Sequence, residues 1–229
     1  MKRIGLLGGM SFESSIEYER LINERVRATL GGAASADLII RSYNFAQIET
    51  LQEQGRWADA GSLLATDAVM MQTAGAELIA LCTNTMHKVA PEIESAIDVP
   101  FVHIVDATAD AIAEAGVASV GLLGTRYTME DPFYSDRLAM HGIATLVPDE
   151  PDRTVVHDII FDELVQGVVA EDSKHAYVGA IDRLENRGAL GIVAGCTEIE
   201  LLVQAEDIGL PYFASTALHV DAIVREALA

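Results

Sequence analysis

The chain has 229 residues and a formal net charge of −20 at pH 7, and half of its residues are hydrophobic. This length is sufficient for one large or two small domains with a substantial core, and the hydrophobic content excludes a disordered chain. The acidic excess excludes a nucleic-acid partner, because binding to phosphate requires clustered lysine and arginine. Two cysteines, and no apolar run near the ~20 residues of a membrane helix, predict a cytoplasmic protein with no membrane partner. The apolar start at residues 4–10 contains three glycines, and we expect no export signal there.

Strand-like and helix-like segments alternate along the whole chain. The expected strands are residues 3–7, 36–42, 78–82, 101–105, 119–123, 143–146, 190–194 and 211–213. The expected helices between them include residues 14–30, 57–73, 106–115 and 157–169, which combine 3.6-residue apolar spacing with many alanines and leucines. Residues 148–152, which contain two prolines, are expected to form a surface loop. Continuous apolar strands that alternate with helices are typical of an α/β fold with a parallel sheet covered on both faces.

Four sequence landmarks occur twice in the same order, which indicates an internal duplication. Gly5 and Gly121 of the first landmark are 116 positions apart, and Pro100 and Pro211 of the last are 111 apart. Such a slow drift is typical of a duplicated unit with small deletions. The predicted fold is therefore two pseudo-symmetric lobes, each a parallel sheet flanked by helices, with the active site at the lobe interface.

The expected lobe boundaries follow from this repeat. Residues 1–98 plus 208–229 are expected to form the first lobe, and residues 99–207 the second. The first lobe carries Thr83 and the second carries Cys196, which stand at matching positions of the two copies.

Three patterns that suggest cofactors are incomplete in this chain. The turn Gly5–Ser11 lacks the spacing of a dinucleotide-binding loop and the Gly-Lys pair of a phosphate-binding loop, so we expect a tight turn whose amides face a pocket. The six histidines form no close ligand pair, so no metal is expected. None of the three lysines lies at an apolar strand end suited to a Schiff base, so no pyridoxal cofactor is expected.

The loops that follow two buried strands carry the residues best suited to chemistry. Ligands of α/β proteins bind beyond the carboxyl ends of the strands, and a helix N-terminus there favours a carboxylate. Asn84, Thr85 and Thr197 are hydrogen-bond donors for such a group. The same helix field is expected to lower the pKa of Cys196 and favour its thiolate. Glu198 has two interpretations, a proton relay for Cys196 or an acidic residue of the first helical turn.

Four motifs together resemble the aspartate/glutamate racemase family along essentially the whole chain. They are Gly-Leu-Leu-Gly-Gly-Met-Ser at 5–11, Asn-Thr-Met-His at 84–87, Gly-Thr-Arg-Tyr-Thr-Met at 124–129 and Gly-Cys-Thr-Glu at 195–198. The resemblance implies two pseudo-symmetric α/β lobes, an active site between them, no cofactor, an amino acid substrate and a homodimer. It also implies one cysteine per lobe, one removing the α-proton and the other returning a proton to the opposite face.

This chain departs from that pattern in its first lobe. The residue before Asn84 is Thr83, and Cys82 stands one place earlier. Because side chains alternate along a strand, Cys82 is expected to point into the lobe core, unless a local bulge reverses the order. The resemblance is closest to L-aspartate/glutamate-specific racemases with threonine in place of the first cysteine. It implies Thr83 and Cys196 as the catalytic pair: a Cys196 thiolate removes the α-proton of the L enantiomer, and the Thr83 hydroxyl donates a proton from the other face.

The resemblance also predicts the substrate-binding residues but leaves the preferred substrate open. Those residues are Met10, Gln52, Asn84, Thr85, Thr125, Thr197 and Glu198. Some aspartate-acting relatives carry a lysine after a Glu-Leu pair, where this chain has Val165. Its absence weakens the case for aspartate and leaves glutamate or a broader polar set open, with Arg41, Arg56 or Arg126 as sources of the missing positive charge.

Two other functions remain open at this stage. One is a maleate isomerase or hydantoin racemase type of enzyme, but those enzymes are expected to keep a cysteine in each lobe, and Thr83 argues against them. The other is a non-catalytic amino-acid-binding protein, against which the intact Asn84-Thr85 and Cys196-Thr197-Glu198 segments argue.

Overall fold

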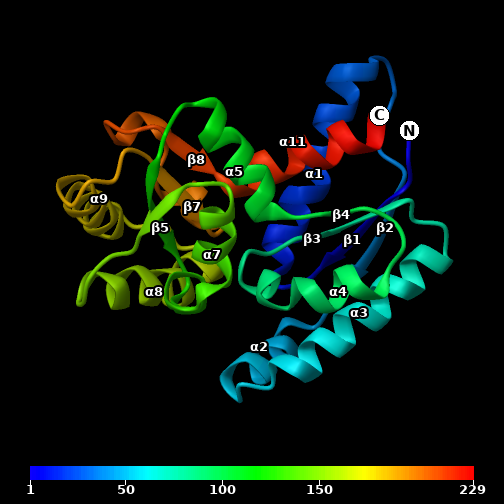
Figure 1. Ribbon diagram of the computed structural model, residues 1–229, viewed down its shortest axis with the longest axis horizontal. Helices are drawn as coiled ribbons and strands as arrows, with labels where there is room; N and C mark the ends of the chain where they lie inside the picture. Colours follow the sequence, from blue (N-terminus) through cyan, green and yellow to red (C-terminus); the bar gives the residue numbers. More distant parts are fainter. The chain divides into compact units, whose positions relative to one another are not determined.

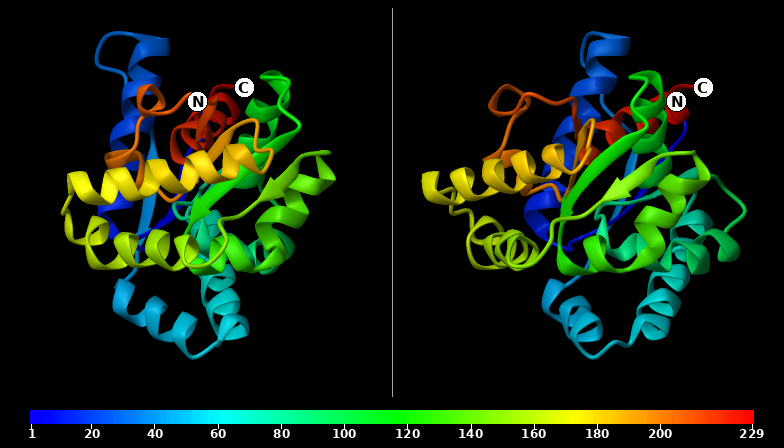
Figure 2. Two further views of the ribbon diagram at one scale, coloured as in Figure 1. Left: turned by 90° about the vertical axis from the view of Figure 1, so that its left-hand side faces the viewer. Right: turned by 60° about the vertical axis from the view of Figure 1, so that its left-hand side comes forward.

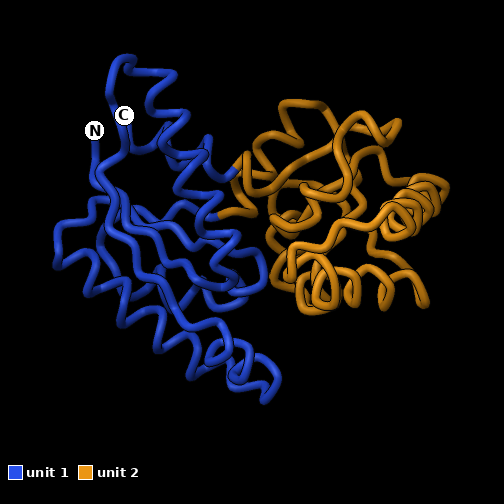
Figure 3. The backbone as a smooth tube through the Cα atoms, turned by 180° about the vertical axis from the view of Figure 1, so that it is seen from behind, with its two compact units in different colours: residues 1–103, 219–229 blue, residues 104–218 orange.

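The computed structural model describes residues 1–229, and the chain forms two compact units (Figure 3). Unit 1 comprises Met1–His103 and His219–Ala229, and unit 2 comprises Ile104–Leu218. The chain thus crosses between the units after residues 103 and 218, whereas crossings after 98 and 207 were expected. The difference arises because the last strand of each repeat pairs within its own sheet, so each crossing comes only after that strand.

Unit 1 contains a four-stranded parallel sheet in the order β2-β1-β3-β4. Its elements are β1 (Ile4–Gly8), α1 (Phe12–Leu30), β2 (Leu38–Ser42), α2 (Phe45–Glu53), α3 (Trp57–Thr73), β3 (Leu78–Leu81), the 3₁₀ helix η1 (Thr85–Val89), α4 (Ala90–Ala96), β4 (Phe101–Val102) and most of α11 (Ser215–Leu228). Helices α3 and α4 cover one face of this sheet, and α1 and α11 cover the other (Figure 1).

Alternation along β3 decides the environment of the first cysteine. Ile79 and Leu81 pack on the α3 face, whereas Ala80 and Cys82 pack on the α1 and α11 face. Cys82 is only 1% exposed there, in agreement with its expected place in the core. Burial raises the pKa of the Cys82 thiol far above its ordinary value, so this residue is a small unreactive core side chain.

Unit 2 repeats the same architecture with the strand order β6-β5-β7-β8. Its elements are α5 (Ile104–Glu114), β5 (Ser119–Gly124), α6 (Arg126–Glu130), α7 (Pro132–Met140), β6 (Ala144–Leu146), α8 (Asp152–Asp162), η2 (Leu164–Gln166), α9 (Glu171–Asn186), β7 (Ile192–Gly195), α10 (Ile199–Leu202), η3 (Ala205–Asp207) and β8 (Tyr212–Ala214). Helices α5 and α7 pack on one face, and α8 and α9, which lie side by side, pack on the other (Figure 2). The predicted fold of two parallel-sheet lobes, each flanked by helices, is confirmed.

Two expected elements differ from those observed. The strand expected at 101–105 ends at Val102, because the chain enters α5 at Ile104. The helix expected at 157–169 begins earlier, at Asp152, and ends at Asp162 before a short 3₁₀ turn. Gly167 then adopts a left-handed conformation with φ of 75°, which stops helical continuation. No helix has the length and apolar character that crossing a membrane requires.

Candidate functional site

The strand register places Thr83 and Cys196 at equivalent positions of the two sheets. Ile79 of β3 and Ile192 of β7 pair with corresponding glycines of β1 and β5. Thr83 follows the first isoleucine by four residues, and Cys196 follows the second by four. Each therefore stands at the carboxyl end of the third strand of its unit, where α/β proteins bind ligands. By the same count Cys82 corresponds to a glycine, not to Cys196.

The backbone of Thr83 is held by hydrogen bonds on both sides. Its N–H donates to the carbonyl of Leu81 at 2.9 Å, and its carbonyl accepts from His87 Nδ1 at 2.7 Å. Because a carbonyl only accepts, this contact fixes the proton of His87 on Nδ1. The Thr83 side chain is half-buried, and His87 is almost completely buried. A tight turn and a buried imidazole together fix the orientation of this threonine.

His87 belongs to a cluster of three buried histidines in unit 1. Its ring centroid lies 4.5 Å from that of His103 and 5.7 Å from that of His219. His219 Nε2 donates to the Val102 carbonyl at 2.8 Å, so its Nδ1 accepts from the Tyr18 hydroxyl, also at 2.8 Å. Burial lowers the pKa of His219 to about 4, so this ring is neutral near pH 7. The three rings pack against one another, and His87 contacts the loop directly, through the Thr83 carbonyl. A sequence signal exists only for His87, which belongs to the motif at 84–87.

The turn after β1 is stabilised by internal hydrogen bonds. Gly9 has φ of 82°, and a Cβ there would lie 2.3 Å from the Tyr43 nitrogen, so only glycine fits. The Gly9 N–H donates to Ser15 Oγ at 2.6 Å. Ser11 accepts from the Ser14 N–H at 3.3 Å and caps α1. The expectation that the amides of this turn face a pocket is wrong for Gly9, because the helix that follows supplies its acceptor.

The other residues predicted for unit 1 are buried and lie near the loop that follows β3. Met10 is 5% exposed and packs in the core cluster that also contains Met86. The Gln52 side-chain N–H donates to Met86 Sδ at 3.0 Å. Asn84 and Thr85 are buried at the start of η1. Gln52, Asn84 and Thr85 thus place buried polar groups near the apolar cluster that contains Met10 and Met86.

Cys196 and Glu198 form a direct hydrogen bond in unit 2. The thiol donates to Glu198 Oε2 at 2.9 Å, with Cys196 half-buried and Glu198 buried. Burial, and then the charge and the hydrogen bond of Glu198, raise the pKa of the Cys196 thiol well above its ordinary value. The expected lowering by a helix field is wrong, because α10 has only four residues and a carboxylate lies nearer. The resting form is therefore a thiol paired with a carboxylate.

The residue after Cys196, Thr197, belongs to a pair of hydroxyl groups; Thr197 was predicted for the site, and its partner Thr216 was not. Thr197 Oγ1 lies 2.9 Å from Thr216 Oγ1, and the Thr216 N–H donates to Glu200 Oε1 at 3.2 Å. Ser215 donates to the Ala194 carbonyl at 2.6 Å and ties the end of β8 to β7. The available signal was the position of residues 215 and 216, directly after the strand that neighbours β7.

Thr125 lies beside the cysteine loop on the neighbouring strand. It follows Gly124, which pairs with Gly195, so Thr125 and Cys196 leave adjacent strands at the same level, about 5 Å apart in backbone. A Cβ on Gly195 would lie 2.9 Å from the Leu123 carbonyl, so glycine is needed for this close approach. Thr125 Oγ1 accepts from the Thr128 N–H at 3.3 Å and caps α6.

The three arginines considered for substrate binding have different surroundings. Arg41 pairs with Asp67 at 2.9 Å and stacks on Tyr43, and Arg56 pairs with Asp59 at 2.7 Å. The Arg126 side chain contacts no carboxylate, and its Nε is buried without a hydrogen-bond partner. No group of three or more His, Cys, Asp or Glu side chains is placed to hold a metal ion.

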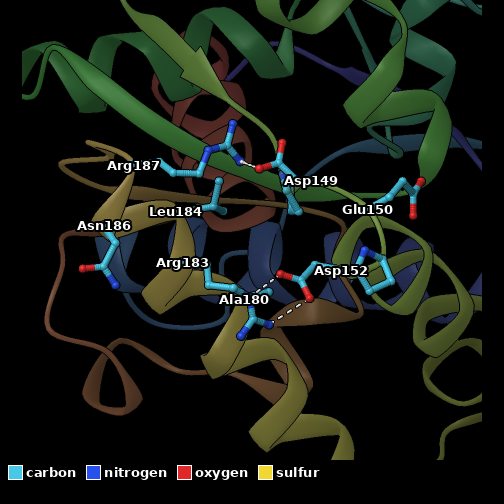
Figure 4. A pocket seen from close by; sticks show the side chains of 10 residues that line it. Asp149, Glu150, Asp152, Ala180, Arg183, Leu184, Asn186 and Arg187 are labelled. Carbon is cyan, nitrogen blue, oxygen red and sulfur yellow. Dashed lines mark hydrogen bonds and ion pairs between the residues drawn. The ribbon is translucent and has the colours of Figure 1, made fainter.

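Unit 2 also contains a cavity of about 410 Å³, away from the predicted site residues. It lies between the loop after β6 and the last turns of α9 (Figure 4). Figure 4 shows Arg183 reaching Asp152 and Arg187 reaching Asp149 across it. Both of its arginines are therefore already paired. None of the predicted site residues lines this cavity.

Comparison with known proteins decides the family. The sequence profile of the Asp/Glu/Hydantoin racemase family matches residues 7–223. The protein belongs to the Asp/Glu/Hydantoin racemase family. The match covers nearly the whole chain, including every predicted site residue, and it confirms the resemblance found in the four sequence motifs.

Individual members of this racemase family are similar to the chain over most or all of its length. A candidate Asp/Glu racemase from Yersinia pestis is 50% identical, with a TM-score of 0.95 and full coverage of both chains. An aspartate racemase homologue from Pyrococcus horikoshii OT3 is 34% identical, with a TM-score of 0.88 and full coverage of both chains. A broad-specificity amino-acid racemase of Bacillus subtilis (strain 168) is 26% identical over 172 residues, which cover 71% of this chain and 70% of that protein. Family, fold and relatives together support racemase activity.

Proposed function

We propose that this protein is a cofactor-independent racemase of aspartate and glutamate. Cys196 acts on one face of the substrate α-carbon and Thr83 on the other. The observation that carries the proposal is the equivalence of the two residues in strand register, combined with a proton acceptor beside the sulfur. Two copies of one loop that present different groups are suited to a reaction with two faces.

The first step is removal of the α-proton from the L enantiomer. The Cys196 thiol gives its proton to Glu198 Oε2, and the resulting thiolate takes the proton from the α-carbon. A raised thiol pKa makes the thiolate scarce but strongly basic, which suits a very weakly acidic carbon. Glu198 is thus assigned the relay role, the first of its two interpretations.

The second step is proton return on the opposite face. The Thr83 hydroxyl donates its proton to the carbanion, which is a much stronger base than an alkoxide, and water then returns a proton to the Thr83 oxygen. Glu198 loses its acquired proton to solvent, so the protein ends the cycle unchanged. His87 is a positioning residue in this scheme, since it holds the Thr83 carbonyl and not its hydroxyl.

The substrate-binding role falls to the residues next to the catalytic pair. Asn84, Thr85 and Thr197 hold the α-carboxylate, whose charge grows as the α-proton leaves. The remaining wall is assigned to Met10, Gln52, Thr125 and Glu198. The proposal includes no cofactor or metal and places the protein in the cytoplasm as a homodimer.

Replacing Glu198 by glutamine tests the relay. The pKa of the Cys196 thiol is expected to fall, because the charge and acceptor that raise it are removed. Alkylation of Cys196 by iodoacetamide should therefore begin at lower pH than in the wild type. Catalysis should nevertheless fall about a hundredfold, because the proton acceptor is lost. If the pH dependence of Cys196 alkylation is unchanged in this variant, or if catalysis stays at the wild-type rate, Glu198 has no part in the mechanism.

The function itself is tested by solvent-deuterium exchange at the α-carbon of L-Asp, D-Asp, L-Glu and D-Glu. A racemase of acidic amino acids exchanges the α-proton and interconverts the enantiomers, without added cofactor and after dialysis against chelator. A maleate isomerase would instead act only on maleate, and a hydantoin racemase only on hydantoins. A binding protein would retain the amino acid without exchange. Any of these last three outcomes would contradict the proposal.

A further inference from the structure

Arg126 stands beside the candidate catalytic loop of unit 2. It directly follows Thr125, whose strand pairs with β7 up to Gly124 and Gly195. In the duplicated architecture it corresponds to Met10 of unit 1, since each lies five residues after the matching glycine of its first strand. Arg126 is therefore two residues beyond the sheet edge at which Cys196 emerges.

One end of the Arg126 guanidinium forms a hydrogen bond, whereas its Nε–H has no acceptor. Its Nη2 donates to Thr154 Oγ1 at 3.3 Å, and its backbone N–H donates to His157 Nδ1 at 3.2 Å. Its Nε is buried and has no hydrogen-bond partner. A buried N–H of a charged group without an acceptor is rare in native structures and calls for an explanation.

Nearby carboxylates do not neutralise this arginine. Glu130 pairs with Arg153 at 3.1 Å, and Glu150 accepts from Arg153 at 3.3 Å and from Thr154 at 2.8 Å. His157 cannot offset the charge of Arg126, because an imidazole is never anionic here; burial and then the charge of Arg126 lower its pKa and disfavour its cationic form. Arg126 thus forms no ion pair with a carboxylate, in a chain with 35 acidic and 15 basic residues.

Every other half-buried arginine is paired with a carboxylate. These are Arg3, Arg25, Arg41, Arg137 and Arg153. The two remaining arginines without an ion pair, Arg27 and Arg225, are exposed to solvent. The exception therefore lies at the functional loop, where a ligand would supply the missing acceptor.

We propose that Arg126 binds the side-chain carboxylate of the substrate through its Nε–H and a neighbouring N–H. This inference rests on the proposed racemase function and specifies that the site selects amino acids with an acidic side chain. A planar guanidinium offers two parallel donors to a carboxylate, a geometry that a neutral amide substrate cannot match with the same charge. Val165, at the position where a lysine was considered, leaves this task to another cation.

The test compares acidic substrates with their neutral amides in Arg126→Gln and Arg126→Lys. In wild-type protein, α-proton exchange should favour L-aspartate over L-asparagine and L-glutamate over L-glutamine. In Arg126→Gln, kcat/KM for the acids should fall on the order of 30-fold, mainly through KM, while that for the amides stays within about threefold. Arg126→Lys keeps the positive charge but not the two parallel donors of a guanidinium, and kcat/KM for the acids should fall about fivefold.

Matched controls and a binding measurement separate the possible failures. Arg153→Gln removes an ion-paired arginine from α8, the helix that also carries Thr154. This variant should leave the acid-to-amide ratio of kcat/KM unchanged, as should Arg41→Gln. If Arg126→Gln leaves the acid-to-amide ratio of kcat/KM unchanged, or lowers kcat/KM equally for acids and amides, the inference is overturned while the racemase function stands. If the wild type exchanges no acidic amino acid, the racemase function fails, and calorimetry with succinate and succinamate then decides on Arg126. Tighter binding of succinate that is lost in Arg126→Gln would support the inference, and equal binding by both proteins would overturn it.

Discussion

Replacing Cys196 by serine is expected to reduce α-proton exchange from L-aspartate about a thousandfold. The substitution changes one atom, so the substrate should still bind, but a serine hydroxyl beside the carboxylate of Glu198 does not ionise near neutral pH. The proposed proton relay, which starts from the hydrogen bond of Cys196 to Glu198, would therefore be interrupted at its base. Loss of the α-proton signal in deuterated water, followed by NMR, measures the effect directly.

Cys82→Ala provides the matched control for this experiment. Cys82 lies in the core of unit 1 with a strongly raised pKa, and its removal should leave exchange within about threefold of wild type. A thermal unfolding curve for both variants shows that the fold is kept. Exchange at the wild-type rate in Cys196→Ser, or loss of exchange in Cys82→Ala alone, would contradict the assignment of the base.

Replacing Thr83 by cysteine is expected to increase α-proton exchange from the D enantiomer about a hundredfold relative to the L enantiomer. In the proposed mechanism the D enantiomer presents its α-proton to the Thr83 face, where a hydroxyl can donate a proton but is a poor acceptor. A thiol at this position supplies an acceptor, and it takes the place that Cys196 holds in the other unit. The gain follows from chemistry at one face and leaves the Cys196 face unaltered.

The readout must be exchange and not net racemisation. The two enantiomers have equal free energy in solution, so kcat/KM for racemisation is the same in both directions for any enzyme. Wild-type protein should exchange the α-proton of L-aspartate with retention of configuration faster than it converts L-aspartate to D-aspartate. Thr83→Cys should reduce the ratio of these two rates. An unchanged ratio of D to L exchange in this variant would exclude Thr83 from the reacting face.

Hydrophobic pattern and repetition were sufficient to predict the fold. The buried runs at Leu78–Leu81 and Ile192–Gly195 have no polar face, which is what a sheet covered on both sides requires, and both are third strands of parallel sheets. Local signals failed where tertiary pairing decides. The fourth strand of unit 1 ends after two residues because the chain enters α5 at Ile104, and α8 ends at Asp162 because Glu163 leaves helical backbone geometry.

The position of the candidate loops was predictable from the sequence, but their electrostatics were not. Motifs identified the loops at 83–85 and 196–198, yet the pKa of Cys196 depends on the distance and burial of Glu198, which a sequence does not contain. Contacts such as that between Thr197 and Thr216 join segments from two different strands, and no local pattern indicates them. The exceptional state of Arg126 is likewise visible only once the partners of all other half-buried arginines are known.

The most direct test of a two-faced reaction is a crystal structure of the wild-type protein with bound aspartate. We predict that the α-carbon lies between Cys196 Sγ and Thr83 Oγ1, each about 3.5 Å away and on opposite faces. Aspartate bound with both groups on the same face, or with either of them remote from the α-carbon, would contradict the proposed mechanism.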